Sequence, residues 1–258
     1  MKLINFLYEI IFPAENYNLL FFLVFTFLIS GIIKGFLGIG LPAAAMALLT
    51  LVMEPKVAIS LLTLPIIFTN VAQFFRSENK IQVMNEYKYF SLVLILSIFC
   101  VSIFINFYPT DFLTISIGIA MIVFVMNDLI GVKLKIDKKI IWQIIFGSIA
   151  GVLGGLSSIW SPPVAMYLIA RGISKEKFIG TAGFLLLSGC FPLALGLIIA
   201  GVFTIETAIK SLFGLFFVLA GFSIGEFLRK KISQNLFKKF VLFAFLIMGI
   251  RLVFLGLL

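Results

Sequence analysis

The sequence contains no histidine, only two cysteines and only 11 acidic residues in 258 positions. Histidine is the side chain that titrates near neutral pH and the commonest metal ligand, so its absence removes the usual proton relay and metal centre. Cys100 and Cys190 form no CxxC pair and lie in apolar runs, which favours buried structural thiols over redox chemistry. No carboxylate lies at the centre of an apolar segment, so paired catalytic acids are missing as well. We therefore expect no enzyme activity, no cofactor and no metal site.

Apolar residues are what the sequence has in excess. It is 62% hydrophobic and 12% charged, with a mean hydropathy of +1.22. A soluble protein of this size needs far more polar surface, so the composition predicts an all-α integral membrane protein with the lipid bilayer as its surroundings. Residues 1–18 are too short and too interrupted for a span, and no small-residue cleavage site follows, so an interfacial segment is expected there.

Hydrophobic runs between polar connections predict ten segments. The second and the seventh are too short to cross a hydrocarbon layer of about 30 Å at about 1.5 Å per residue. Each begins with proline, at Pro42 and at Pro162, which suits the first turn of a helix. We interpret each as a short helix that folds back after a broken one, and crossing and re-entry both stay open. The segments are 19–38, 42–53, 56–76, 87–108, 111–131, 139–157, 162–171, 175–202, 205–230 and 234–257.

The net charge of +9 could suggest a nucleic-acid partner, but the positions of the cations argue against one. Most of the lysines and arginines cluster in four connections, which is the signature of loops that face the cytoplasm. The alternating connections, at 54–56, 108–111 and 203–206, carry few cations and are expected outside, as are both termini. The clustered cations are Arg76, Lys80, Lys88, Lys133, Lys135, Lys138, Lys139, Arg171, Lys175, Lys177, Arg229, Lys230, Lys231, Lys238 and Lys239.

A glycine triplet indicates an internal repeat. Both copies lead into a short helix that begins with proline, and both open a set of five segments. Because five is odd, the second copy must be inverted in the membrane, which predicts two inverted repeats over 19–131 and 132–258. The two triplets are Gly31, Gly35 and Gly38, and Gly147, Gly151 and Gly154.

Inverted repeats with broken helices are how many secondary transporters build a site near the membrane midplane. Irregular backbone at that depth requires protein or a watery cavity to satisfy it. Helices that start at Pro42 and Pro162 would direct N–H groups and positive dipole ends into such a cavity, where they attract anions. Lys34 adds a positive charge to the first break. The stretch LGGLSSIWSPP adds hydroxyl donors to the second. The sequence therefore predicts a cationic, donor-rich site for an oxyanion.

Each candidate also has a structural interpretation. Lys34 could extend its ammonium to the interface, the glycines could only allow close helix packing, and the serines could cap their own helix. Asn70 and Gln73, one turn apart, are either interhelical hydrogen-bonding groups or cavity lining. Gly38 and Gly154 are expected where the backbone bends or where a ligand approaches closely. The predicted substrate-binding residues are Lys34, Gly35, Gly38, Gly40, Asn70, Gln73, Ser157, Ser158, Trp160, Ser161 and Thr181.

Two motifs carry a family resemblance. GxxxGxxGIGLP followed by PKVAISLLT, and GxxxGxxGGLSSIWSPP followed by GISKEKFIGTAGF, resemble the sulfite exporter TauE/SafE family, also called TSUP. The resemblance covers about residues 20 to 257. It implies an inner-membrane carrier that exports a small sulfur-containing anion such as sulfite or an organosulfonate.

The residues and the resemblance together predict a secondary transporter that works by alternating access. A passive anion channel is the alternative, since it too would need cationic loops and helix ends. The duplicated broken helices favour the carrier. The coupling ion and the oligomeric state stay open.

Overall fold

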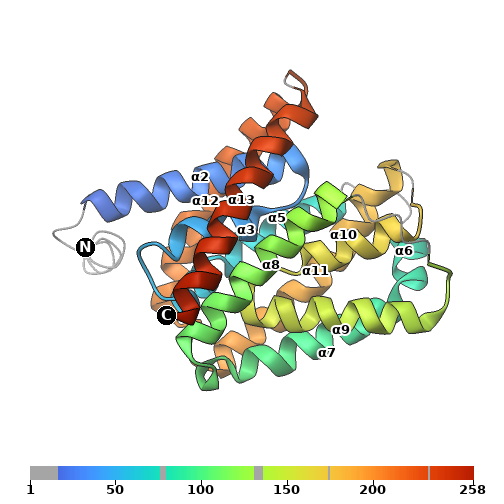
Figure 1. Ribbon diagram of the computed structural model, residues 1–258, viewed down its shortest axis with the longest axis horizontal. Coiled ribbons are helices and arrows are strands. Elements are labelled where there is room, and N and C mark those ends of the chain that lie inside the picture. The colour runs from blue at the N-terminus through green and yellow to red at the C-terminus, as the bar shows by residue number, and fades with distance from the viewer. Residues whose placement is uncertain (1–16, 76–79, 131–135, 174, 232) are drawn as a thin grey trace.

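The computed structural model describes residues 17–75, 80–130, 136–173, 175–231 and 233–258, and in these ranges the chain forms helices and no strand (Figure 1). The predicted all-α class is confirmed, while the segment expected over 1–18 lies almost entirely outside the described residues. The helices are α2 (Tyr17–Leu37), α3 (Leu41–Leu49), α4 (Pro55–Leu61), α5 (Thr63–Phe75), α6 (Lys80–Glu86), α7 (Lys88–Ile103), the 3-10 turn η1 (Ile105–Phe107), α8 (Thr110–Ile130), α9 (Ile140–Ser157), α10 (Ser161–Ala170), α11 (Lys175–Ile199), α12 (Ile205–Arg229) and α13 (Gln234–Leu257).

A helix occupies each of the ten predicted segments. Within the described residues, five helices are long and apolar enough to cross a membrane, and up to seven spans result if the bent pairs α4–α5 and α6–α7 each count as one. Large apolar side chains such as Phe216 and Phe240 are about 70% exposed on the outer faces, as lipid-facing residues are. The chain is therefore a multi-pass membrane protein. Helix α6, within a basic connection, was not predicted.

The helices pack in pairs that are distant in the sequence. Helix α2 lies against α12, α7 against α9, α8 against α13, and α5 against α11; Figure 1 shows α7 and α9 side by side. The short helix α3 contacts α2 and α13, and the short helix α10 contacts α9 and α8. Each short helix therefore lies inside the bundle, with most of its residues buried.

Glycines set the closest helix contacts. A Cβ at Gly35 of α2 would overlap the carbonyl oxygen of Phe222 in α12, and a Cβ at Gly225 of α12 would overlap that of Ile32 in α2. In the second pair, a Cβ at Gly151 of α9 would overlap the side chain of Ser97 in α7. The packing interpretation is therefore confirmed for Gly31 and Gly35, whereas nothing lies within 4 Å of where a Cβ at Gly38 would be.

The two breaks differ from each other. Gly38 and Gly40 adopt left-handed backbone, with φ of +80° and +96°, so the bend expected at Gly38 is confirmed. The chain does not bend at Gly154, because this residue continues α9 and leaves room for the Trp160 ring, 3.1 Å from where a Cβ would lie. The other expectation for Gly154, close approach of a ligand, stays a prediction. The second break comes instead at Ser158, the non-glycine residue with a φ of +60° among those described.

We expect Gly225→Val to lower stability strongly, because the added Cβ would push α12 away from the backbone of α2. Overpacking costs about 1–3 kcal/mol where the neighbours can shift, and backbone shifts less easily than side chains. Thermal unfolding of the purified protein in detergent measures the effect. The control is Gly172→Asn, at a turn with open space and a φ of +65°, which asparagine tolerates. Equal unfolding temperatures for the two variants would contradict the close contact.

Candidate functional site

Lys34 is buried in the last turn of α2, directly before the first break, with 2% of its surface exposed. Its ammonium donates a hydrogen bond of 2.7 Å to Oδ1 of Asn70 in α5. In the described part of the chain no ion pair includes Lys34. The side chain is thus held inside the bundle by a neutral amide and does not extend to an exposed interface. The negative end of the α2 dipole adds some compensation for the charge.

A hydrogen-bonded network continues from Asn70 to the second break. Because the Asn70 oxygen accepts from Lys34, its amide nitrogen is left to donate, and it donates to Sγ of Cys190 in α11 at 3.3 Å. Cys190 in turn donates to the carbonyl oxygen of Leu186 at 3.2 Å. The indole N–H of Trp160, in the α9–α10 connection, donates to the same oxygen at 3.2 Å. The network therefore connects the lysine break to the serine-rich break through α5 and α11.

The three serines of the second break have different roles. Ser157 donates to the carbonyl of Leu153 at 2.5 Å and accepts from the N–H of Ile159 at 3.1 Å, so it satisfies its own backbone as a cap. The hydroxyls of Ser158 and Ser161 are buried and have no hydrogen-bond partner among the described residues. A buried polar group without a partner costs about 1–3 kcal/mol, so these two hydroxyls are available to a ligand.

The first turns of both short helices lack a side-chain cap. In α3, Pro42 removes one N–H, and the amides of Leu41 and Ala43 remain without an intrahelical acceptor. In α10, Pro162 and Pro163 remove two, so that helix end offers fewer backbone donors. Ser161 is the first residue of α10, and Ser158 is the C-cap of α9.

Of the predicted residues not yet described at the breaks, Gly35, Gln73 and Thr181 form none of the network's hydrogen bonds given above. Gly35 faces α12 and serves helix packing. Gln73 is buried one turn from Asn70, beside Gly183 of α11. Thr181 is buried as well, but it precedes Cys190 by nine residues, or about 14 Å along the helix axis. The hydrogen-bonded network therefore connects Lys34, Asn70 and Trp160, and Ser158 and Ser161 lie within two residues of Trp160 in the chain.

The cysteines show where reasoning from the sequence was incomplete. Cys190 is buried, as expected for a structural thiol, but it also links Asn70 to Leu186. Cys100 was expected to be buried, and this is wrong: it is exposed on α7. Both cysteines lie in uniformly apolar segments, so no periodic signal distinguished the face that packs inside from the face that meets lipid.

Comparison with known protein families matches residues 23–252 to the family described as sulfite exporter TauE/SafE. A search of curated proteins and a search of solved structures each found no match. The family match spans both breaks and every residue of the network, and its members are membrane transporters, not enzymes. The chain belongs to the sulfite exporter TauE/SafE family.

Proposed function

We propose that this transporter carries a small sulfur-containing oxyanion, of the sulfite or organosulfonate type, outward across the membrane by alternating access. The observation that carries the proposal is the buried Lys34 ammonium, whose hydrogen-bond partner is a neutral amide. An ammonium in a low-dielectric interior is costly unless an opposite charge accompanies it. A bound anion supplies that charge, and its oxygens can also accept from the hydroxyls of Ser158 and Ser161 and from the uncapped amides of α3.

The helix pairs support an inverted repeat. If α2 corresponds to α9, α7 to α12 and α8 to α13, then the α2–α12 contact becomes the α9–α7 contact, while α8–α13 maps onto itself. A glycine allows close packing in both of these contacts: Gly35 in the α2–α12 contact and Gly151 in the α9–α7 contact. Two equivalent halves around one site are suited to alternating access, in which one half moves against the other.

Substitution of the lysine tests the site. Lys34→Gln keeps a hydrogen-bond donor but removes the charge, so we expect affinity for sulfite to fall tenfold or more, which is about 1.4 kcal/mol. Lys34→Arg should retain part of the affinity, because it keeps the charge in a planar shape. The measurement is the thermal shift of purified protein in a sulfite titration.

The matched control is Lys210→Gln, which removes one charge at an exposed position where Lys210 pairs with Glu206. It should bind sulfite as the parent does. If Lys34→Gln binds sulfite as tightly as the control, the anion does not rely on the lysine.

Counterflow in liposomes separates a carrier from a channel. A carrier should show saturable flux of labelled sulfite that unlabelled sulfite on the opposite side accelerates, since the loaded site returns faster than the empty one. A passive channel gives no such acceleration. Flux that is linear in concentration and indifferent to substrate on the opposite side would support the channel instead.

We also propose that both termini face outward, because the basic connections mark the cytoplasmic side. In a background with Cys100→Ser, which removes the exposed native thiol, Lys230→Cys should resist a membrane-impermeant thiol reagent in intact cells. Glu206→Cys, at the opposite end of α12, should react readily. The reverse pattern would invert the orientation. Lys135, also predicted to be cytoplasmic, lies outside the described residues.

A further inference from the structure

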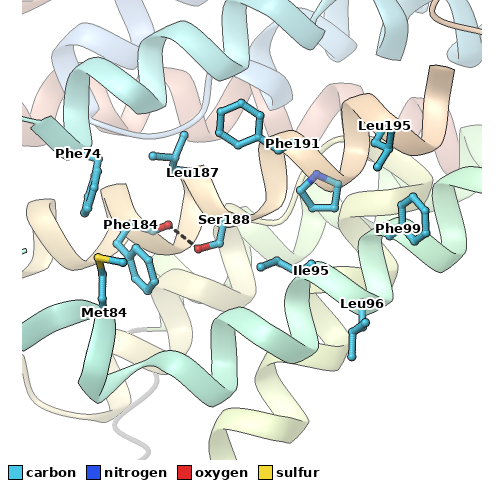
Figure 2. A pocket seen from close by; sticks show the side chains of 11 residues that line it. Phe74, Met84, Ile95, Leu96, Phe99, Phe184, Leu187, Ser188, Phe191 and Leu195 are labelled. Carbon is cyan, nitrogen blue, oxygen red and sulfur yellow. Dashed lines mark hydrogen bonds between the residues drawn. The ribbon is translucent and has the colours of Figure 1, made fainter. Parts of the chain in front are cut away.

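An apolar groove lies on the lipid-facing side of the bundle, between α5, α6, α7 and α11 (Figure 2). Its volume is about 570 Å³, and exposed side chains such as Leu96 and Phe191 line it. Among the described residues of the lining, Ser188 carries the one hydroxyl. This hydroxyl already donates to the carbonyl of Phe184 at 2.9 Å and accepts from Ser91 at 2.8 Å. The groove therefore offers no donor to an anionic substrate and is separate from the site around Lys34.

The length of the groove matches one lipid leaflet. Along α11 its lining runs from Phe184 to Leu195, which is about 17 Å at about 1.5 Å per residue. Half of a hydrocarbon layer of about 30 Å is about 15 Å. One acyl chain, extended from the headgroup level toward the midplane, fits this length.

Lysines lie at one end of the groove. Met84 of α6 lines this end, and Lys80 precedes it by one turn on the same face of the helix. The Lys80 ammonium lies 5.6 Å from the centre of the Phe75 ring, which is 6.0 Å from the ring of Phe74 in the groove.

A second lysine approaches the same end. Lys88 starts α7 two turns before Ile95, which lines the groove on the same face. Glu86 does not neutralise the two lysines, because Arg171 already holds it at 3.1 Å. An acyl chain in the groove would thus place its phosphate next to two ammonium groups.

We propose that this groove binds one anionic phospholipid, with an acyl chain against α7 and α11 and the phosphate at Lys80 and Lys88. Anionic headgroups are attracted to lysines at the membrane surface. A second copy of the chain fits less well, since a two-fold interface through this groove would bring the same lysines together. The opposite face of α11 carries Cys190, so the lipid packs against the back of the helix that holds the polar network.

The test is a titration of the purified full-length protein with phosphatidylglycerol, followed by native mass spectrometry. Phosphatidylcholine with the same chains and glycerol 1-phosphate are the comparison ligands. We expect one saturable phosphatidylglycerol site, at least tenfold weaker binding of phosphatidylcholine, and no binding of glycerol 1-phosphate. Equal binding of the two phospholipids, or binding of glycerol 1-phosphate alone, would overturn the proposal.

Two variants locate the site. Leu96→Trp fills the groove and should reduce phosphatidylglycerol binding at least tenfold, whereas Leu212→Trp on α12, at a leucine with nearly the same exposure (56% against 54%), should not. Lys80→Gln with Lys88→Gln should lower phosphatidylglycerol binding to the phosphatidylcholine level, and Lys230→Gln with Lys231→Gln should leave it unchanged.

Fold and assembly are checked on the same samples. Both tryptophan variants should unfold at the parent's temperature without added lipid, because both replaced leucines are exposed. Indistinguishable lipid binding by Leu96→Trp and Leu212→Trp would exclude the groove. A parent dimer that Leu96→Trp converts to monomer would show that a second copy fills the groove, and this result too would overturn the proposal.

Discussion

The hydrogen bond between Lys34 and Asn70 is the interaction on which the polar interior depends. It holds the Lys34 ammonium in position inside the helix bundle. Because the Asn70 amide is neutral, the bond does not neutralise the charge. The left-handed glycines Gly38 and Gly40 end α2 within about two turns of Lys34, so this residue lies in the last turn, toward the negative end of the helix dipole. On the proposed function, the remaining compensation comes from the transported anion.

Helix α11 connects this bond to the rest of the molecule. The Sγ atom of its Cys190 accepts a hydrogen bond from the Asn70 amide. The carbonyl oxygen of Leu186, one turn earlier, accepts from both the Cys190 thiol and the Trp160 indole. One helix therefore fixes the distance between the two breaks. A rotation of α11 would disturb the partners of Asn70 and Trp160 together. On the proposed alternating access, α11 is therefore the helix through which a change at one break would reach the other.

The segments and breaks could be predicted from the sequence because their signals are local: run length, glycine, proline and clustered charge. The partners could not, since Lys34 and Asn70 lie on different segments and uniformly apolar helices do not show which face packs inside. The same limit applies to Gly154, which has the same place in its glycine triplet as Gly38. Gly38 bends the chain, whereas Gly154 provides room for the Trp160 indole. This limit also explains why Cys100 is exposed while Cys190 is buried and takes part in the network.

The two breaks contribute different chemistry to the proposed anion site. The first offers a full charge and the uncapped amides of Leu41 and Ala43. The second begins a helix with Pro162 and Pro163, which start the helix without strain but remove the amides that would otherwise bind an anion. The hydroxyls of Ser158 and Ser161, buried and without partners, replace those donors. Because hydroxyls rotate while backbone amides do not, the second break can adapt to oxygens at different angles, whereas the charge of the first break fixes the sign of the ligand.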